Sequence, residues 1–394
     1  MRVNYKSIFR ILFLFTVFLL VLCIIPFRKE MFNSIKSKVE RSNTLLNDYV
    51  KINEFCNSKI EGKSAVIFEP NCYHHECLPG YIKYFTDLGY NVDVLIQSGF
   101  ECSLNYFEPK SKVRIFTFNN LKDVEFLYKK ISKKFHKYDC AFLQTTDFNN
   151  KNLIKKLGFF DNPKSMLVLH ETDFVEKIGL QELHSKERLI GLADYGKLVY
   201  VNPNYFGEFP SKEKNKETIF YISSTANREY YYLLEAAKKL KDNGYKFKVK
   251  VTGHCNQFSA QNVPSYLEDC FEFYGTVPYD QLFSIVNGVD FIILNLNPNN
   301  YSDKPFLSKK ASGSVQLSYG FYKPLIINSE FSSIYKLSSE NSILYNDNEL
   351  YSAMLKAINM SQENYSLMSS NLKLLRNKIY EISLNNLSNV LNKI

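Results

Sequence analysis

The sequence predicts an α/β protein in which two Rossmann-like domains face each other across a cleft and follow one transmembrane helix. Three observations lead to this expectation. Residues 11–27 form an uncharged apolar run, short β-type runs alternate with amphipathic helical runs from Ser64 onward, and the alternation stops near residue 210 and then resumes. A chain of 394 residues is long enough to bury two cores of roughly 150 residues each.

The apolar run Ile11–Phe27 predicts a membrane anchor. As a helix it spans about 25 Å, close to a hydrocarbon core of about 30 Å. A cleaved signal peptide is the alternative, but no small-x-small cleavage site follows the run. We therefore expect a tail and single-pass anchor over residues 1–27 and a polar helical stalk over residues 28–62.

The side of the membrane is harder to predict, because basic residues flank the anchor almost evenly. The eight cysteines form no paired CxxC motif and are too sparse for a disulfide scaffold, which favours a reducing compartment. We expect the body in the cytosol, and a lumenal body stays open. The formal charge of +9 is spread along the chain without a dense basic block, so no nucleic-acid partner is expected.

The first domain is expected over residues 63–210. Its pattern predicts strands over residues 65–68, 91–96, 113–118, 140–143, 166–169 and 198–201, and helices over residues 78–88 and 124–135. A charged stretch, residues 208–217, then predicts a linker.

The second domain is expected over residues 217–394. Strands are predicted over residues 218–222, 247–251, 271–274, 291–294 and 324–327, helices over residues 230–243, 279–287 and 314–319, and a helical close over residues 348–392. No GxGxxG follows the first strand and no Walker A sequence occurs, which argues against a dinucleotide cofactor and against an ATPase. Ligands are expected in the crevice at the carboxyl ends of both sheets.

Several short segments carry a family resemblance over roughly residues 64–370. They are His75–Gly80 with Leu88–Val94, Met166–Glu171, Ala193–Asn202, Ile222–Ala236, Val249–Gly253, Phe273–Val277 and Ala311–Ile326. In their order and spacing they resemble the GT-B glycosyltransferases, and among these glycosyltransferase family 4 (group 1). The resemblance implies transfer of a sugar from a nucleotide-sugar donor to a glycan or lipid-linked acceptor, with the nucleotide sugar as substrate and no cofactor.

One departure from that family is plain. The family usually carries two glutamates in an E-x7-E pattern, but the corresponding stretch, Lys309–Leu317, has no acidic residue and holds Lys310, Ser312 and Ser314 instead. No DxD triplet lies in a suitable loop either, so no metal is expected.

The resemblance and the loop positions together suggest a donor site. His170 ends a predicted strand at the crevice and is the catalytic candidate. The donor-binding candidates are Ser223, Ser224, Asn227, Arg228, Tyr274, Gly275, Val277, Lys310, Ser312, Gly313 and Ser314. Backbone N–H groups before a helix, a guanidinium and a lysine suit a diphosphate. Helix capping and a tight turn are the structural alternatives.

His74, His75 and Glu76 lie in the first crossover loop, which in the family faces the acceptor. Asp290 and Asp303, on either side of a predicted strand, are further acidic candidates near the cleft. Two other functions stay open: a catalytically silent module that binds a glycan or nucleotide sugar, which the missing glutamates favour, and a sugar-nucleotide epimerase.

Overall fold

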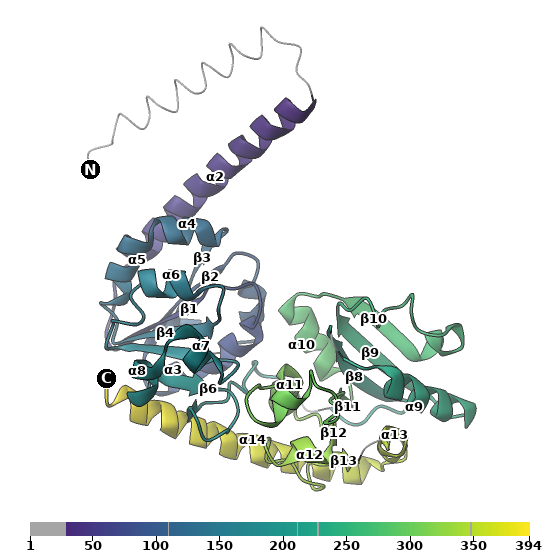
Figure 1. Cartoon of the computed structure of the whole chain (residues 1–394). Coiled ribbons are helices and arrows are strands. Elements are labelled where there is room, and N and C mark those ends of the chain that lie inside the picture. Colours follow the sequence, from purple (N-terminus) through teal and green to yellow (C-terminus); the bar gives the residue numbers. More distant parts are fainter. Residues whose placement is uncertain (1–28, 109, 211, 227, 347–348) are drawn as a thin grey trace, which may run out of the picture.

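The computed structural model describes residues 29–108, 110–210, 212–226, 228–346 and 349–394. Within these ranges lie two parallel sheets, one of seven strands in the order β3-β2-β1-β4-β5-β6-β7 and one of six in the order β10-β9-β8-β11-β12-β13. Each sheet carries its own helices, so two α/β bodies stand side by side (Figure 1). The expected pair of Rossmann-like domains is confirmed.

The strands of the first sheet are β1 Ser64–Glu69, β2 Asn91–Gln97, β3 Val113–Phe118, β4 Cys140–Thr146, β5 Ser165–Leu169, β6 Leu189–Gly191 and β7 Val199–Tyr200. Those of the second are β8 Thr218–Ser224, β9 Phe247–Gly253, β10 Phe271–Gly275, β11 Phe291–Leu294, β12 Leu325–Asn328 and β13 Ser342–Tyr345. The central strands β1, β4 and β11 are buried along their whole length, as expected of parallel strands covered on both faces.

The α-helices of the first half are α2 Lys29–Asn57, α3 Leu78–Asp87, α4 Leu121–Phe126, α5 Tyr128–Phe135, α6 Lys151–Lys156, α7 Phe174–Ile178 and α8 Gln181–Ser185. Those of the second half are α9 Tyr231–Asp242, α10 Tyr279–Asn287, α11 Gly313–Phe321, α12 Ser329–Ser332, α13 Leu350–Ile358 and α14 Gln362–Leu391.

Two expected elements differ in detail, and two strands were not expected. The helix expected over residues 124–135 is two helices, α4 and α5, which meet at Leu127. The helical close divides because Ser361 caps α14, with its side chain accepting a hydrogen bond from Asn364 N. The sequence pattern missed β6 and β13, which are only three and four residues long.

The expected anchor, Ile11–Phe27, lies outside the described residues. The stalk expected over residues 28–62 is mostly the single helix α2, which extends outward from the first domain (Figure 1). In the ranges that the structure describes, no helix combines the length and apolar character needed to cross a bilayer.

Helix α14 connects the two cores. Leu372 and Ile379 pack into the core of the second domain, whereas Leu387 and Val390 pack into the core of the first. Figure 1 shows this helix in yellow, running beneath both bodies. A single rigid element therefore helps to hold the two sheets beside one another.

The strand order fixes where a ligand can enter the second domain. Strand β8 lies between β9 and β11. The connection that leaves β8 therefore runs toward β9, whereas the connection that leaves β11 runs toward β12, in the opposite direction. Loops leave such a switch point in opposite directions and open a crevice at the carboxyl ends of the strands.

Candidate functional site

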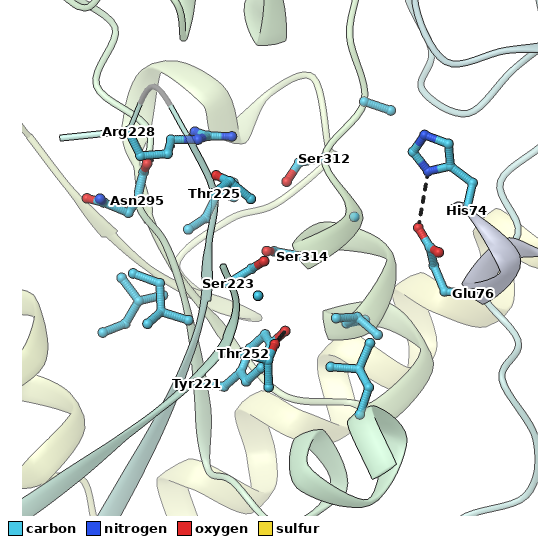
Figure 2. A pocket seen from close by; sticks show the side chains of 18 of the residues that line it. His74, Glu76, Tyr221, Ser223, Thr225, Arg228, Thr252, Asn295, Ser312 and Ser314 are labelled. Atoms are coloured by element: carbon cyan, nitrogen blue, oxygen red, sulfur yellow. Dashed lines mark hydrogen bonds and ion pairs between the residues drawn. The ribbon is translucent and has the colours of Figure 1, made fainter. Parts of the chain in front are cut away.

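A cavity of about 410 Å³ opens at this switch point and extends to the first domain. Most of its wall comes from loops at the carboxyl ends of β8, β9, β10 and β11 and from the start of α11, while two side chains come from the first domain (Figure 2). The polar residues in its wall are His74, Glu76, Tyr221, Ser223, Thr225, Arg228, Thr252, Thr276, Tyr279, Asn295, Lys310, Ser312 and Ser314.

The amino-terminal end of α11 forms one wall. Ser312 has extended backbone angles typical of a capping residue, yet its side chain makes no capping hydrogen bond. Among the described residues, the backbone N–H groups of Gly313 and Ser314 have no acceptor. Since the helix dipole adds partial positive charge here, this end can attract an anion, and the capping explanation for Ser312 does not hold.

Arg228 stands in a fixed position in the wall. Its Nη1 lies 3.0 Å from Asp303 Oδ1 and donates to the carbonyl of Asn295 at 3.1 Å, and its guanidinium packs over the ring of Phe306. Asp303 is almost fully buried and also accepts from Asn297 N. The acidic candidate Asp303 therefore positions the guanidinium, and the cavity receives a preorganised cation.

His74 and Glu76 form the first domain's contribution. His74 Nδ1 lies 3.3 Å from Glu76 Oε1, the contact dashed in Figure 2. Burial favours the neutral carboxyl, but hydrogen bonds from His74 and Tyr279 outweigh it and lower the pKa of Glu76. A carboxylate thus orients the His74 ring at the cavity wall.

His170 lies behind His74 and not in the cavity wall. The two rings stack with centroids 3.8 Å apart, and His170 Nε2 lies 3.5 Å from Thr145 Oγ1. Burial and the neighbouring His74 hold the pKa of His170 well below its ordinary value, so the ring is neutral. Of the two imidazoles, His74 is the one that a ligand in the cavity can touch.

Lys310 joins the two domains at the edge of the cavity. Its Nζ lies 2.8 Å from Glu171 Oε1, and its carbonyl accepts from the Tyr195 hydroxyl at 2.5 Å. The positive charge expected here is thus paired with a carboxylate from the first domain. An incoming phosphate would compete with Glu171 for it.

Val277 lines the cavity, whereas four other candidates lie outside its wall. Ser224 is buried and donates to Phe258 O, Tyr274 donates to Glu272, Gly275 forms a left-handed turn, and His75 is fully buried against Phe100. Asn227 lies outside the described residues. Burial lowers the pKa of His75 to about 4.

The other acidic candidate, Asp290, lies away from the cavity. It precedes β11 at the amino end of the sheet and accepts hydrogen bonds from Asn215 N and Ile219 N. It therefore ties the linker to the second sheet, and its expected position near the cleft was wrong.

Several wall residues were missed from sequence. Thr252, Gly253 and Asn295 end or follow strands β9 and β11, so the rule that ligands bind at carboxyl ends of strands could have found them. Tyr221 lies in the middle of β8, so that rule does not indicate it. Tyr279 and Phe306 have no such signal, because they enter from a helix start and a long loop. Over the described ranges, no cluster of three or more His, Cys, Asp or Glu is placed to hold a metal ion.

No family model and no curated protein sequence matches the chain. Among solved structures, the spinosyn forosaminyltransferase SpnP is similar over 84% of this chain and 99% of its own, with 12% identity and a TM-score of 0.45. The lipopolysaccharide outer core galactosyltransferase WaaB, in its apo form, covers 83% and 99% with 10% identity and a TM-score of 0.44. The S. aureus MnaA–UDP complex covers 85% and 98% with 14% identity and a TM-score of 0.45. At such scores these likenesses say nothing about the ligand of this cavity.

Proposed function

We propose that this chain is a membrane-anchored glycosyltransferase that moves a sugar from a nucleotide-sugar donor to a glycan or lipid-linked acceptor, without an essential metal. One observation carries the proposal: an anion site from the second domain and a carboxylate-oriented histidine from the first face the same 410 Å³ cavity. The first suits a diphosphate, and the second suits a hydroxyl that must lose its proton.

The donor diphosphate is assigned to α11 and Arg228. Phosphate oxygens would bind the free N–H groups of Gly313 and Ser314 and the guanidinium of Arg228. Lys310 would leave its ion pair with Glu171 and bind the departing diphosphate. These cations supply the charge that a metal ion supplies elsewhere.

The acceptor hydroxyl is assigned to His74. In the proposed step its imidazole takes the hydroxyl proton, the acceptor oxygen bonds to the anomeric carbon, and the bond from that carbon to the diphosphate breaks. Glu76 would orient the ring and stabilise the imidazolium that forms. His170, the catalytic candidate from the sequence, would stack on the His74 ring and fix its orientation.

The membrane part of the proposal rests on the sequence. The uncharged run Ile11–Phe27 would hold the cavity near a lipid-linked or membrane-bound acceptor, with the body in the cytosol.

The test begins with a thermal-shift screen of nucleotide sugars on the full chain, because a ligand that binds the folded state raises its melting temperature. Transfer to a lipid-linked acceptor extract is then measured with the donor that binds. We expect His74→Gln to lower kcat by about 10²–10⁴-fold with donor affinity nearly unchanged. His136→Gln is the matched control, because His136 is exposed, lies outside the cavity wall, and has its Nδ1 2.8 Å from the carbonyl oxygen of Ser132.

The outcomes separate the alternatives. A donor that binds without any turnover, whatever residue 74 is, would support the silent binding module. Epimerised free product would support the epimerase. Binding of no nucleotide sugar at all would sink the proposal.

A further inference from the structure

A second cavity, of about 250 Å³, lies beside the 410 Å³ cavity described above, at the carboxyl ends of β11, β12 and β13. Asn295 lines both cavities, and it lies next to Arg228 in the wall of the first (Figure 2). The ion pair of Arg228 with Asp303 separates the two, because Arg228 lines the first cavity and Asp303 lines the second. The second cavity is therefore a distinct space with its own wall.

Two buried side chains form the floor of this second cavity. Asn328 and Tyr345 stand opposite each other at the ends of β12 and β13, and they leave only 3% and 7% of their surfaces exposed. Asn328 Oδ1 accepts a hydrogen bond from Glu330 N at 3.0 Å, but in the described ranges neither Asn328 Nδ2 nor the Tyr345 hydroxyl has a partner. Burial and the neighbouring Asp303 raise the pKa of Tyr345, so its hydroxyl keeps its proton and can donate.

These two donors call for a ligand. A buried polar group without a hydrogen bond costs roughly 1–3 kcal/mol, and native proteins leave few such groups unsatisfied. Here two of them point into the same cavity from adjacent strands. A molecule with acceptor oxygens at the floor would satisfy both.

The other end of the second cavity is open. Glu229 and Asn299 line it and are both exposed, in contrast to the buried floor. A ligand can therefore enter with one end and leave the remainder of its structure in solvent.

The charges of the wall disfavour an ion. Among the described residues of the wall none is basic, and the carboxylates of Glu229 and Asp303 would repel an anion. Asp303 is already paired with Arg228 at 3.0 Å, which leaves Glu229 as the one carboxylate in the described wall without a cationic partner. A calcium ion needs several such oxygen ligands.

The remaining hydrogen-bonding groups are neutral. They are four amides and two phenols, from Asn295, Asn297, Asn299, Asn328, Tyr232 and Tyr345. Amides and phenols both donate and accept hydrogen bonds, as the hydroxyl groups of a sugar do. The two rings and the aliphatic side chains of Leu296 and Leu350 supply apolar contacts for the C–H faces of a sugar ring.

We propose that the second cavity binds a neutral sugar, as a free monosaccharide or as the terminal residue of a glycan. The sugar hydroxyls accept from Asn328 Nδ2 and Tyr345 Oη at the floor. This inference does not depend on the proposed enzymatic activity, because it concerns a separate cavity with its own ligand.

The test is saturation-transfer difference NMR on the full chain, in a detergent that has no sugar head group. The probes are glucose, galactose, mannose and N-acetylglucosamine, with maltotriose and chitotriose beside them. We expect at least one of these sugars to bind. A trisaccharide that binds more tightly than its monosaccharide assigns the cavity to a glycan end, and equal binding assigns it to the single sugar.

Two floor variants locate the bound sugar. Tyr345→Phe removes one hydroxyl and should weaken binding about 3–10-fold, the loss of one hydrogen bond. Asn328→Asp keeps the oxygen that caps α12 and removes the Nδ2 donor, so it should weaken binding by at least as much. Tyr266→Phe is the matched control, because Tyr266 is exposed and lines neither cavity. Melting temperatures equal to that of the parent confirm that the variants fold.

Three results would overturn the proposal. The first is binding of no sugar, which leaves water as the partner of the floor donors. The second is a sugar that binds the parent, Tyr345→Phe and Asn328→Asp equally, since it then occupies another site. The third is an ion in the cavity: inorganic phosphate or calcium chloride that raises the melting temperature of the parent but not of Tyr345→Phe.

Discussion

A row of polar and titratable side chains runs from the interior of the first sheet to the cavity. Thr145 Oγ1 donates to Glu69 Oε2 at 2.5 Å, Thr145 lies 3.5 Å from His170, and His170 stacks on His74 beside Glu76. Burial raises the pKa of Glu69 to about 8, against the hydrogen bonds from Thr145 and Asn71, whereas burial lowers that of His170. At neutral pH the Glu69 carboxyl is therefore protonated, whereas the His170 ring is not.

This assignment predicts a pH dependence of stability. An unfolded glutamate ionises near pH 4.5, but the folded state keeps the Glu69 proton up to about pH 8. The folded state binds more protons across this window, so the free energy of unfolding falls as the pH rises, by up to about 1.4 kcal/mol per pH unit. Glu69→Gln removes the titration, and its stability should fall less steeply in urea unfolding at pH 5, 6.5 and 8.

The control is Glu61→Gln, because Glu61 is exposed. It should reproduce the slope of the parent chain. If the parent and Glu69→Gln lose stability in parallel between pH 5 and 8, Glu69 is ionised in the folded state and the proton assignment is wrong.

The sequence predicted that His170 lies at the carboxyl edge of the first sheet, but not that it lies outside the cavity wall. A strand end predicts that a side chain lies at the carboxyl edge of the sheet, and His170 does follow β5 directly. Which of several imidazoles reaches the cavity depends on the loop after β1, where His74 adopts a left-handed backbone with φ of 68°. No local pattern in the sequence specifies that turn.

At the scale of elements, the carboxyl ends of β8 and β9 are held together by a close backbone contact. Gly253 has φ of +91°, and a Cβ there would lie 2.3 Å from Ser224 O. The adjacent residues Ser223 and Thr252 line the cavity. The glycine therefore permits the approach of two strands that positions the cavity wall.

Gly253→Ala should consequently destabilise the second domain and displace the wall. We expect a loss of about 3–5 kcal/mol from the backbone clash and the positive φ together, measured by urea unfolding. Gly244→Ala is the matched control, since Gly244 has φ of +78° with nothing within 4 Å of the added carbon. It should cost only about 1–2 kcal/mol. Equal losses in the two variants would show that the contact with Ser224 relaxes without cost.

Most strands were predictable because each is a short apolar run between polar turns, and the parallel arrangement follows from the helices between them. The strands β6 and β13 were missed because their aliphatic runs are only two residues long, whereas the runs in β11 and β12, which were predicted, have three. The donor-side loops were predictable as positions, since Arg228 follows β8 and Ser312 and Ser314 stand at the start of a helix. The ion pair of Arg228 with Asp303 was not, because it joins residues 75 positions apart through tertiary packing.

At the scale of the whole molecule, a second contact besides α14 holds the domains together beside the cavity. Residues after β5 pair with the loop before α11: Thr172 N donates to Lys309 O at 2.9 Å, and Glu171 and Lys310 form an antiparallel bridge. Two ion pairs reinforce it, Lys309 with Asp173 at 2.6 Å and Lys310 with Glu171 at 2.8 Å. Since this contact borders the cavity, its strength should set how often the cleft opens.

Lys309→Gln tests this, because Lys309 contributes an interdomain ion pair without lining the cavity. We expect a larger radius of gyration in small-angle X-ray scattering of the ligand-free chain, with a change in the closed-to-open ratio of less than about fivefold, since exposed ion pairs contribute little. The parent should approach the variant as salt is added. Lys177→Gln is the control, because Lys177 lies 3.9 Å from the same Asp173 but within the first domain. If both variants expand equally, the effect arises from Asp173 and its own domain, and Lys309 does not hold the cleft closed.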